Sequence, residues 1–170
     1  MFLDESAFYL LPFVAKTYAP AGQTPLLKEY LSRDHLSMIG AVTADGRLYL
    51  HQHEHPIRQQ EVISFLKRIE REIATPLLVV WDGAPIHRGK QIRSHLASVG
   101  PERLWLEALP GYAPELNPAE GIWQHLKCVD LPNLCCQTLT ELKHQLHNAK
   151  ERLRRKPNLI AAYFDRVGFL

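Results

Sequence analysis

Short apolar runs separated by turn-forming residues characterise the first third of the chain. They predict strands over 2–11, 35–42 and 47–53. Asp45-Gly46 joins the last two, and because this dipeptide favours a tight hairpin turn, we expect that pair to be antiparallel. The stretch 16–30 is interrupted by Pro and Gly and is expected to hold short extended pieces and turns.

The rest of the chain alternates between helical and strand patterns. Apolar residues at helical spacing predict helices from Pro56 to just before Pro76, over 89–98, from Asn117-Pro118 onward, over 138–155 and over 159–164. Two short apolar runs, 77–81 and 104–109, predict strands, and the first is expected to be a central parallel strand covered on both faces. Strands that first cluster and then alternate with helices indicate an α/β fold, a mixed sheet with helices on both faces.

Composition and charge exclude several classes of protein. At 170 residues, with 46% hydrophobic and 22% charged residues and a net charge of +2, the chain resembles one ordinary globular domain. Because no apolar run approaches ~20 residues and no signal-peptide pattern opens the chain, we expect a cytoplasmic protein without a membrane span. Cys128, Cys135 and Cys136 have neither disulfide-framework nor zinc-finger spacing and are expected to be reduced thiols.

Three acidic residues occupy positions where a charge is costly. Asp4 lies inside an apolar run, Asp82 follows the 77–81 run, and Glu120 lies on the first turn of the helix that begins near Asn117-Pro118. A carboxylate at the end of a buried strand is expensive to desolvate unless it is paired or binds a cation. Together the three acids indicate a divalent-metal site and phosphodiester chemistry. Taken singly, each has an ordinary alternative: a pairing carboxylate, a turn acid, or an acid that complements the helix dipole.

Residues next to these acids also have alternative interpretations. Glu5 adjoins Asp4, but adjacent strand residues face opposite ways, so Glu5 is expected outside the metal site. His87 could contact DNA, orient a metal-bound water, or only pack between a loop and a helix. Asn117 is expected to cap the helix of Glu120, and Trp123 is expected to pack beneath it as core.

Basic residues gather in two places. From 140 to 156 there are six Lys or Arg against two Asp or Glu. Phosphate contacts are therefore predicted for Lys150, Arg152, Arg154 and Arg155, and near Asp82 for His87, Arg88 and Lys90. The alternative is a solvated helix face. Thr138 or Thr140 is a plausible cap for this helix.

Three alternating histidines suggest a different kind of site. His51, His53 and His55 would share one face of a strand and could bind zinc or another transition metal. Pro56 follows at once, so the alternative is an exposed strand end.

Four blocks resemble a known family. They are Phe2-Leu-Asp-Glu-Ser6, Val80-Trp-Asp-Gly-Ala-Pro-Ile-His87, Tyr112-Ala-Pro-Glu-Leu-Asn-Pro-Ala-Glu120 with Trp123, and Asn133-Leu-Cys-Cys136. In these blocks the chain resembles the catalytic domain of DDE transposases, in the bacterial insertion-sequence branch of the mariner superfamily. The resemblance covers nearly all 170 residues.

The resemblance implies a ribonuclease-H-like fold with a five-stranded mixed sheet. It carries the catalytic and metal-binding roles onto Asp4, Asp82 and Glu120, with two Mg²⁺ or Mn²⁺ ions as cofactor. The implied activity is phosphodiester hydrolysis at transposon ends followed by 3′-OH strand transfer into target DNA. The implied partners are double-stranded DNA and a second copy in a homodimer, in a nucleoid-associated setting.

The chain departs from the family pattern in two ways. Relatives place helix-turn-helix modules before the catalytic domain, whereas this chain begins almost at the first catalytic strand. We therefore expect 1–170 to be a catalytic domain without that region, with a separate polypeptide as one source of DNA recognition. Gly83 follows Asp82 where a larger or polar residue is common, and is expected to be tolerated in a loop. The competing functions are a ribonuclease-H-like nuclease without strand transfer and a catalytically silent remnant that binds DNA or protein.

Overall fold

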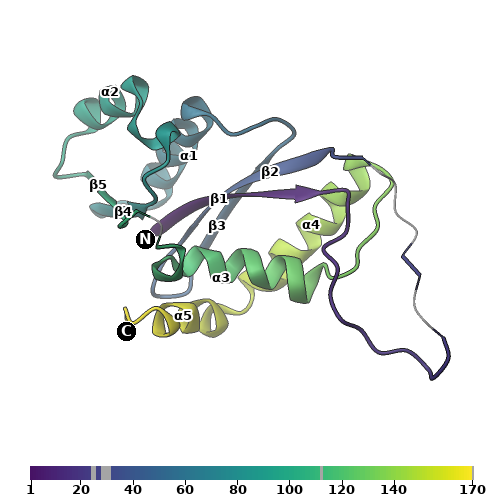
Figure 1. Ribbon diagram of the computed structural model, residues 1–170. Helices are drawn as coiled ribbons and strands as arrows, with labels where there is room; N and C mark the ends of the chain where they lie inside the picture. The colour runs from purple at the N-terminus through teal and green to yellow at the C-terminus, as the bar shows by residue number, and fades with distance from the viewer. Residues whose placement is uncertain (24–25, 28–31, 112, 170) are drawn as a thin grey trace.

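A five-stranded mixed sheet forms the centre of the computed structural model, which describes residues 1–23, 26–27, 32–111 and 113–169 (Figure 1). The strands are β1 (Phe2–Tyr9), β2 (His35–Val42), β3 (Leu48–His53), β4 (Leu77–Trp81) and β5 (Leu104–Ala108), in the order β3-β2-β1-β4-β5. β2 is antiparallel to β1 and β3, whereas β4 is parallel to β1 and β5. The predicted mixed α/β sheet is thus confirmed. Part of the stretch 16–30, and Tyr112 of the third sequence block, lie outside the described residues.

The predicted hairpin joins β2 and β3. The Gly46 amide donates to the Thr43 carbonyl over 2.9 Å, and the Thr43 amide donates to Arg47 over 3.1 Å. Gly46 has a φ of 82°, a conformation that costs glycine little because it has no Cβ. The local Asp-Gly signal therefore identified this turn correctly.

Helices α1 (Gln59–Glu72) and α2 (Lys90–Val99) cover one face of the sheet (Figure 1). Their apolar side chains and those of the strands form one buried cluster, which includes Leu3, Ile39, Val62, Leu66, Ile69, Val79, Trp81 and Ile92. α1 begins three residues after Pro56, because the Glu61 carboxylate accepts the Arg58 amide over 2.9 Å and so fixes the first turn at Gln59.

Helices α3 (Pro118–His125), α4 (Leu139–Arg154) and α5 (Pro157–Arg166) cover the other face. A π-helical turn, Leu126–Asp130, extends α3 and has no signal in the sequence. Thr138 caps α4, its Oγ1 accepting the Glu141 amide over 3.2 Å. α5 begins at Pro157, earlier than predicted, because proline fits the first position of a helix.

Coverage of β4 differs from the prediction. Leu78 on β4 and its neighbour Trp105 on β5 are about half exposed, at 53% and 54%. α3 packs on β1 and β2, and α4 packs on β2, so these helices leave that end of the sheet uncovered. β4 is therefore a parallel strand that is fully covered on one face only.

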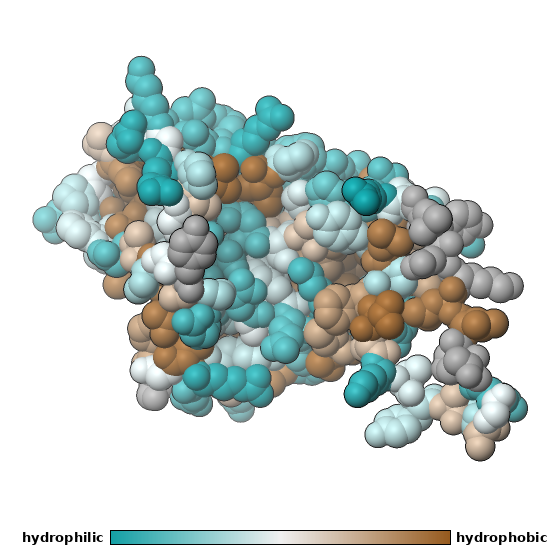
Figure 2. Space-filling view, in the orientation of Figure 1, coloured by the Kyte–Doolittle hydropathy of each residue, from teal (hydrophilic) through white to brown (hydrophobic). Residues whose placement is uncertain are grey.

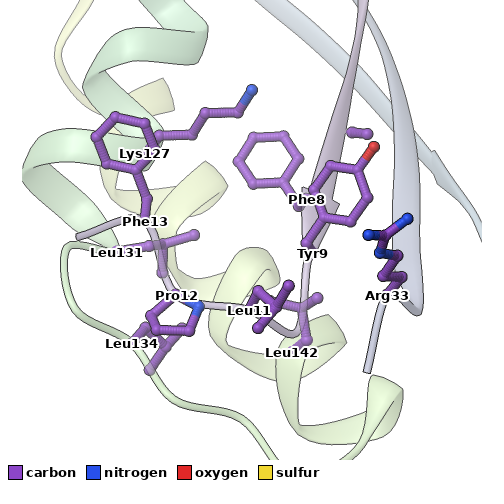
Figure 3. A pocket seen from close by; sticks show the side chains of 11 residues that line it. Phe8, Tyr9, Leu11, Pro12, Phe13, Arg33, Lys127, Leu131, Leu134 and Leu142 are labelled. Carbon is purple, nitrogen blue, oxygen red and sulfur yellow. The ribbon is translucent and has the colours of Figure 1, made fainter. Parts of the chain in front are cut away.

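Asn133 anchors the chain where it leaves β1. Its side chain accepts the Ala15 amide over 2.8 Å and donates to the Ala15 carbonyl over 3.1 Å, while its own backbone is in the left-handed region with a φ of 55°. On this side of the molecule hydrophobic residues gather at the surface (Figure 2). They surround a largely apolar cavity of about 590 Å³ (Figure 3). Its lining consists of Ala7, Phe8, Tyr9, Leu11, Pro12, Phe13, Leu131, Leu134 and Leu142, with the basic residues Arg33 and Lys127. The fourth sequence block thus contributes an anchor and a cavity wall.

Cys128, Cys135 and Cys136 are free thiols, as predicted. Among the described residues, no helix has both the length and the apolar character needed to cross a bilayer.

Candidate active site

Asp4, Asp82 and Glu120 line one cavity of about 690 Å³. Asp4 comes from the middle of β1, Asp82 follows the last residue of β4, and Glu120 lies on the first turn of α3. Because β1 and β4 are adjacent and parallel, the sheet brings the two aspartates to neighbouring strands. The structure therefore brings the three predicted acids to one place.

Asp4 is buried, with 8% of its surface exposed, and Trp123 donates its indole Nε1–H to Asp4 Oδ2 over 2.9 Å. Gly40 lies opposite Asp4 on β2, and a Cβ at Gly40 would stand 2.7 Å from the Trp123 ring. The glycine therefore makes room for the indole that reaches the acid. Trp123 is core, as predicted, and it also fixes one oxygen of Asp4.

The environment of Asp4 disfavours its charge. Burial raises the pKa of the Asp4 carboxyl from 3.8 to about 7, and the charge of Glu120 adds to this effect while the Trp123 hydrogen bond opposes it. In the chain without a bound cation, this carboxyl therefore keeps its proton to a higher pH than an ordinary aspartate does. A divalent ion would relieve the same repulsion by neutralising the cluster.

Asp82 is oriented by its own loop. Its Oδ1 accepts the Ala84 amide over 2.9 Å and lies 2.7 Å from His87 Nδ1. His87 lies in the short 3₁₀ helix η1 (Pro85–Arg88), stacks on Trp81 with ring centroids 4.3 Å apart, and places Nε2 3.1 Å from Glu5 Oε1. Its side chain is fully buried, so the prediction that His87 contacts DNA is wrong.

Two carboxylates bear on the protonation of His87. Burial opposes its charge, but the hydrogen bond to Glu5 and the adjacent Asp82 outweigh burial and raise the pKa of His87 above its ordinary value. Glu5 lies outside the acid cavity, as predicted, yet it is tied to Asp82 through this ring.

Asn117 and Pro118 position Glu120. The Asn117 side chain, 4% exposed, accepts the Ala119 amide over 3.1 Å as the N-cap of α3, as predicted. Pro118 occupies the first helical position. Glu120 itself is exposed, so its carboxylate is accessible from the cavity side of the helix.

Lys127 is a basic neighbour of the acids that the sequence pattern did not indicate. It donates to Ser6 Oγ over 2.8 Å, and Ser6 shares the face of β1 with Asp4. Burial lowers the pKa of Lys127, although the charges of Glu120 and Asp4 act in the opposite direction. Lys127 lies seven positions, or about two helical turns, after Glu120, and this spacing could have indicated a shared helix face.

The predicted DNA contacts separate into groups. Arg88 is exposed and lines the acid cavity, whereas Lys90 is exposed at the start of α2 and lines a different cavity. On α4, Arg152 pairs with Asp130 over 3.1 Å, and Arg154 pairs with Glu151 over 2.6 Å. Arg155 is exposed.

The prediction for Lys150 is wrong. It is 7% exposed and its ammonium donates to Gln52 Oε1 on β3 over 3.1 Å. α4 packs its Lys150 side against the sheet, so this lysine faces inward rather than toward solvent.

The described part of the chain holds no group of three or more His, Cys, Asp or Glu gathered closely enough to hold a metal ion. The ring centroids of His51 and His53 are 4.7 Å apart, and those of His53 and His55 are 5.2 Å apart. The alternative that these three histidines bind a transition metal therefore has no structural support. The same finding covers Asp4, Asp82 and Glu120, whose carboxylates are not gathered closely enough to hold an ion as they stand. The acids differ from the histidines in donor chemistry, because three carboxylates around one cavity offer the hard oxygen ligands that Mg²⁺ and Mn²⁺ prefer. The residues present fit such ions by donor type.

A family model described as DDE superfamily endonuclease matches residues 1–143. The chain belongs to this family. The matched range contains all three acids, Asp4, Asp82 and Glu120. No curated protein matches the chain in sequence.

Solved structures of Mos1 mariner transposase have the same fold as this DDE family member. Its paired-end complex with Mn matches with a TM-score of 0.69 at 16% identity over 98% of this chain and 51% of that one. Its strand transfer complex matches with a TM-score of 0.60 at 16% identity over 98% and 52%. Its isolated catalytic domain matches with a TM-score of 0.56 at 14% identity over 98% and 79%.

The likeness confirms the predicted ribonuclease-H-like architecture. This chain spans about half the length of the Mos1 transposase chains in those DNA complexes.

Proposed function

We propose that the chain is the catalytic domain of a DNA transposase, which hydrolyses phosphodiester bonds at transposon ends and transfers the freed 3′-OH into target DNA. The observation that carries this proposal is the convergence of Asp4, Asp82 and Glu120 on one cavity, inside the range matched by the DDE family. The Mos1 structures support it, since they include complexes with Mn or Mg, with a transposon end and after strand transfer.

Asp4, Asp82 and Glu120 would hold two Mg²⁺ or Mn²⁺ ions. Such a pair of ions supplies activation of the attacking hydroxyl and stabilisation of the leaving 3′ oxygen in an in-line displacement. Trp123 keeps one oxygen of Asp4 engaged, so the orientation of that carboxylate is set before DNA binds.

Basic groups around the cavity would hold the DNA backbone. Lys127 lies along β1 from Asp4 and lines the neighbouring apolar cavity, whereas Arg88 lines the acid cavity itself. Both cations could neutralise phosphate charge next to the reacting bond, whereas Arg155, outside the cavity, could contact backbone further away. A homodimer that bridges two transposon ends, and a separate polypeptide that recognises them, complete the proposal.

The test is cleavage of a labelled duplex with Mn²⁺ or Mg²⁺. The chain is compared with Glu120→Gln and with Glu115→Gln, which removes an equally charged, exposed acid of η2 (Pro114–Leu116) outside the cavity lining. We expect metal-dependent nicking by the chain and by Glu115→Gln, and its loss in Glu120→Gln. Nicking that survives in Glu120→Gln would refute the assignment of the triad.

Strand transfer needs a second substrate. A pre-nicked end with a free 3′-OH should be joined to a target plasmid, and the joined product should be absent for Asp82→Asn. Cleavage without any joining would instead identify a nuclease of the same fold.

A further inference from the structure

His87 connects two acids that come from different strands. Its Nδ1 lies 2.7 Å from Asp82 Oδ1 and 3.1 Å from the Asp82 carbonyl, and its Nε2 lies 3.1 Å from Glu5 Oε1. The His87 side chain is fully buried, whereas the Asp82 side chain is half exposed, at 51%. A buried ring therefore holds a carboxylate that reaches into solvent.

The His87 ring is held by stacking on Trp81, by the turn that carries it and by contacts at both ring nitrogens. Trp81 stacks on it in nearly parallel orientation, with an interplanar angle of 3°, and Trp81 is itself buried at 5% exposure. The His87 amide donates to the Ala84 carbonyl over 3.0 Å, which closes the turn that carries the ring. A purely packing role would be served by any flat apolar ring, and burying two ring nitrogens is costly unless both are hydrogen-bonded. Here Nε2 is hydrogen-bonded to the Glu5 carboxylate, and Nδ1 is hydrogen-bonded to the Asp82 carbonyl and lies 2.7 Å from the Asp82 carboxylate.

The contacts to Asp82 fall on a single oxygen. The Ala84 amide donates to Oδ1, and His87 Nδ1, which is hydrogen-bonded to the Asp82 carbonyl, also lies 2.7 Å from Oδ1. Within the part of the chain that the structure describes, no side chain or amide donates to Oδ2. Asp4 shows the same pattern, since Trp123 takes one of its two oxygens. In each aspartate, a buried aromatic ring nitrogen lies against one carboxylate oxygen and leaves the other for a ligand.

We infer that His87, braced by Glu5, is the positioning residue of Asp82: it fixes Oδ1 so that Oδ2 is held ready for a divalent metal ion. This inference rests on the proposed function, in which Asp82 binds metal. Partners beyond the ligands themselves orient metal-binding groups and commonly change metal affinity by ~10–100-fold when removed. Glu5, whose side chain lies on the opposite face of β1 from Asp4, thereby helps to position Asp82 through His87.

The test measures Mn²⁺ affinity in the absence of DNA, by electron paramagnetic resonance of free Mn²⁺, for the wild type and for variants whose fold is checked by circular dichroism. His87→Phe keeps a flat ring on Trp81 but removes both nitrogens, and should weaken Mn²⁺ binding about 10–100-fold. His87→Gln restores a donor for Asp82 and should recover part of the loss. Glu5→Leu removes the hydrogen-bond partner of His87 Nε2 and should weaken Mn²⁺ binding by a smaller factor than His87→Phe does.

His95 provides a matched control. It is also a buried histidine, 7% exposed, with Nε2 2.8 Å from Glu70 Oε1, but it lies between α1 and α2 and does not line the acid cavity. His95→Phe should lower thermal stability without changing Mn²⁺ affinity.

The outcomes separate this inference from the proposed function. If the wild type binds Mn²⁺, Asp82→Asn abolishes binding and His87→Phe binds as the wild type does, then the positioning role is refuted while the proposed function stands. If His87→Phe does not fold, Glu5→Leu decides, and wild-type affinity in that variant refutes the inference. If the wild type does not bind Mn²⁺ at all, both the metal site and the inference are refuted.

Discussion

Asp4→Asn should stabilise the metal-free protein while it inactivates the proposed site. Asp4 is 8% exposed and its pKa is raised from 3.8 to about 7, with burial as the main cause. The folded protein therefore holds this proton more tightly than the unfolded chain does. The resulting stability is fully present below about pH 4 and is lost as the pH rises toward 7.

The size of the effect follows from the pKa difference. A shift of roughly 3 units corresponds to about 4 kcal/mol in the free energy of unfolding once the carboxyl is ionised. Asparagine has no charge to lose and can still accept the Trp123 hydrogen bond through its amide oxygen. At pH 8 the variant should therefore unfold later than the wild type, with a rise in Tm on the order of 5–15 °C for a chain of this size.

The assay is thermal denaturation in the presence of a chelator at pH 5 and pH 8. Glu115→Gln, which removes the same charge from an exposed position, serves as the control and should leave Tm nearly unchanged. Adding Mn²⁺ at pH 8 should stabilise the wild type and not Asp4→Asn, since only the wild type keeps all three acids.

Two results would refute this reasoning. Equal Tm values for wild type and Asp4→Asn at pH 8 would show that burial does not penalise the charge. An advantage of the same size at pH 5 and pH 8 would show that the gain comes from packing rather than from ionisation.

Three other predictions concern the surroundings of the site. Gly40→Ala should lower the free energy of unfolding by about 1–3 kcal/mol, because the new Cβ would stand 2.7 Å from the Trp123 ring; an unchanged urea midpoint would contradict this. Thr138→Ala should cost ~1 kcal/mol in a thermal melt by removing the N-cap of α4, and no loss would mean that backbone contacts alone hold the helix start. Fluorescence anisotropy of labelled DNA at several salt concentrations should show weaker binding and a flatter salt dependence for Arg155→Glu, since Arg155 is exposed. Lys150→Met, measured on folded protein, should bind DNA as the wild type does because Lys150 is buried. Weaker binding by Lys150→Met and unchanged binding by Arg155→Glu would place the DNA on the other side of α4.

The sequence by itself determined what depends on neighbours along the chain. Asp45-Gly46 specifies a turn, Asn117 and Thr138 cap helices, and Asp82 ends an apolar strand, because each of these signals acts within a few residues. The three acids could be singled out for the same reason, since a charge in or beside an apolar run stands out locally.

Only the tertiary structure decided which distant side chains meet. The indole of Trp123 reaches Asp4 because β2 presents Gly40 at that register, and Lys127 reaches Ser6 because α3 and its π turn lie along β1. Lys150 faces inward because of how α4 is rotated against the sheet, which a basic segment read in isolation could not show. Strand register and helix rotation are set by packing of the whole core, so contacts across 80 or more residues, such as His87 with Glu5, follow from that packing and not from local pattern.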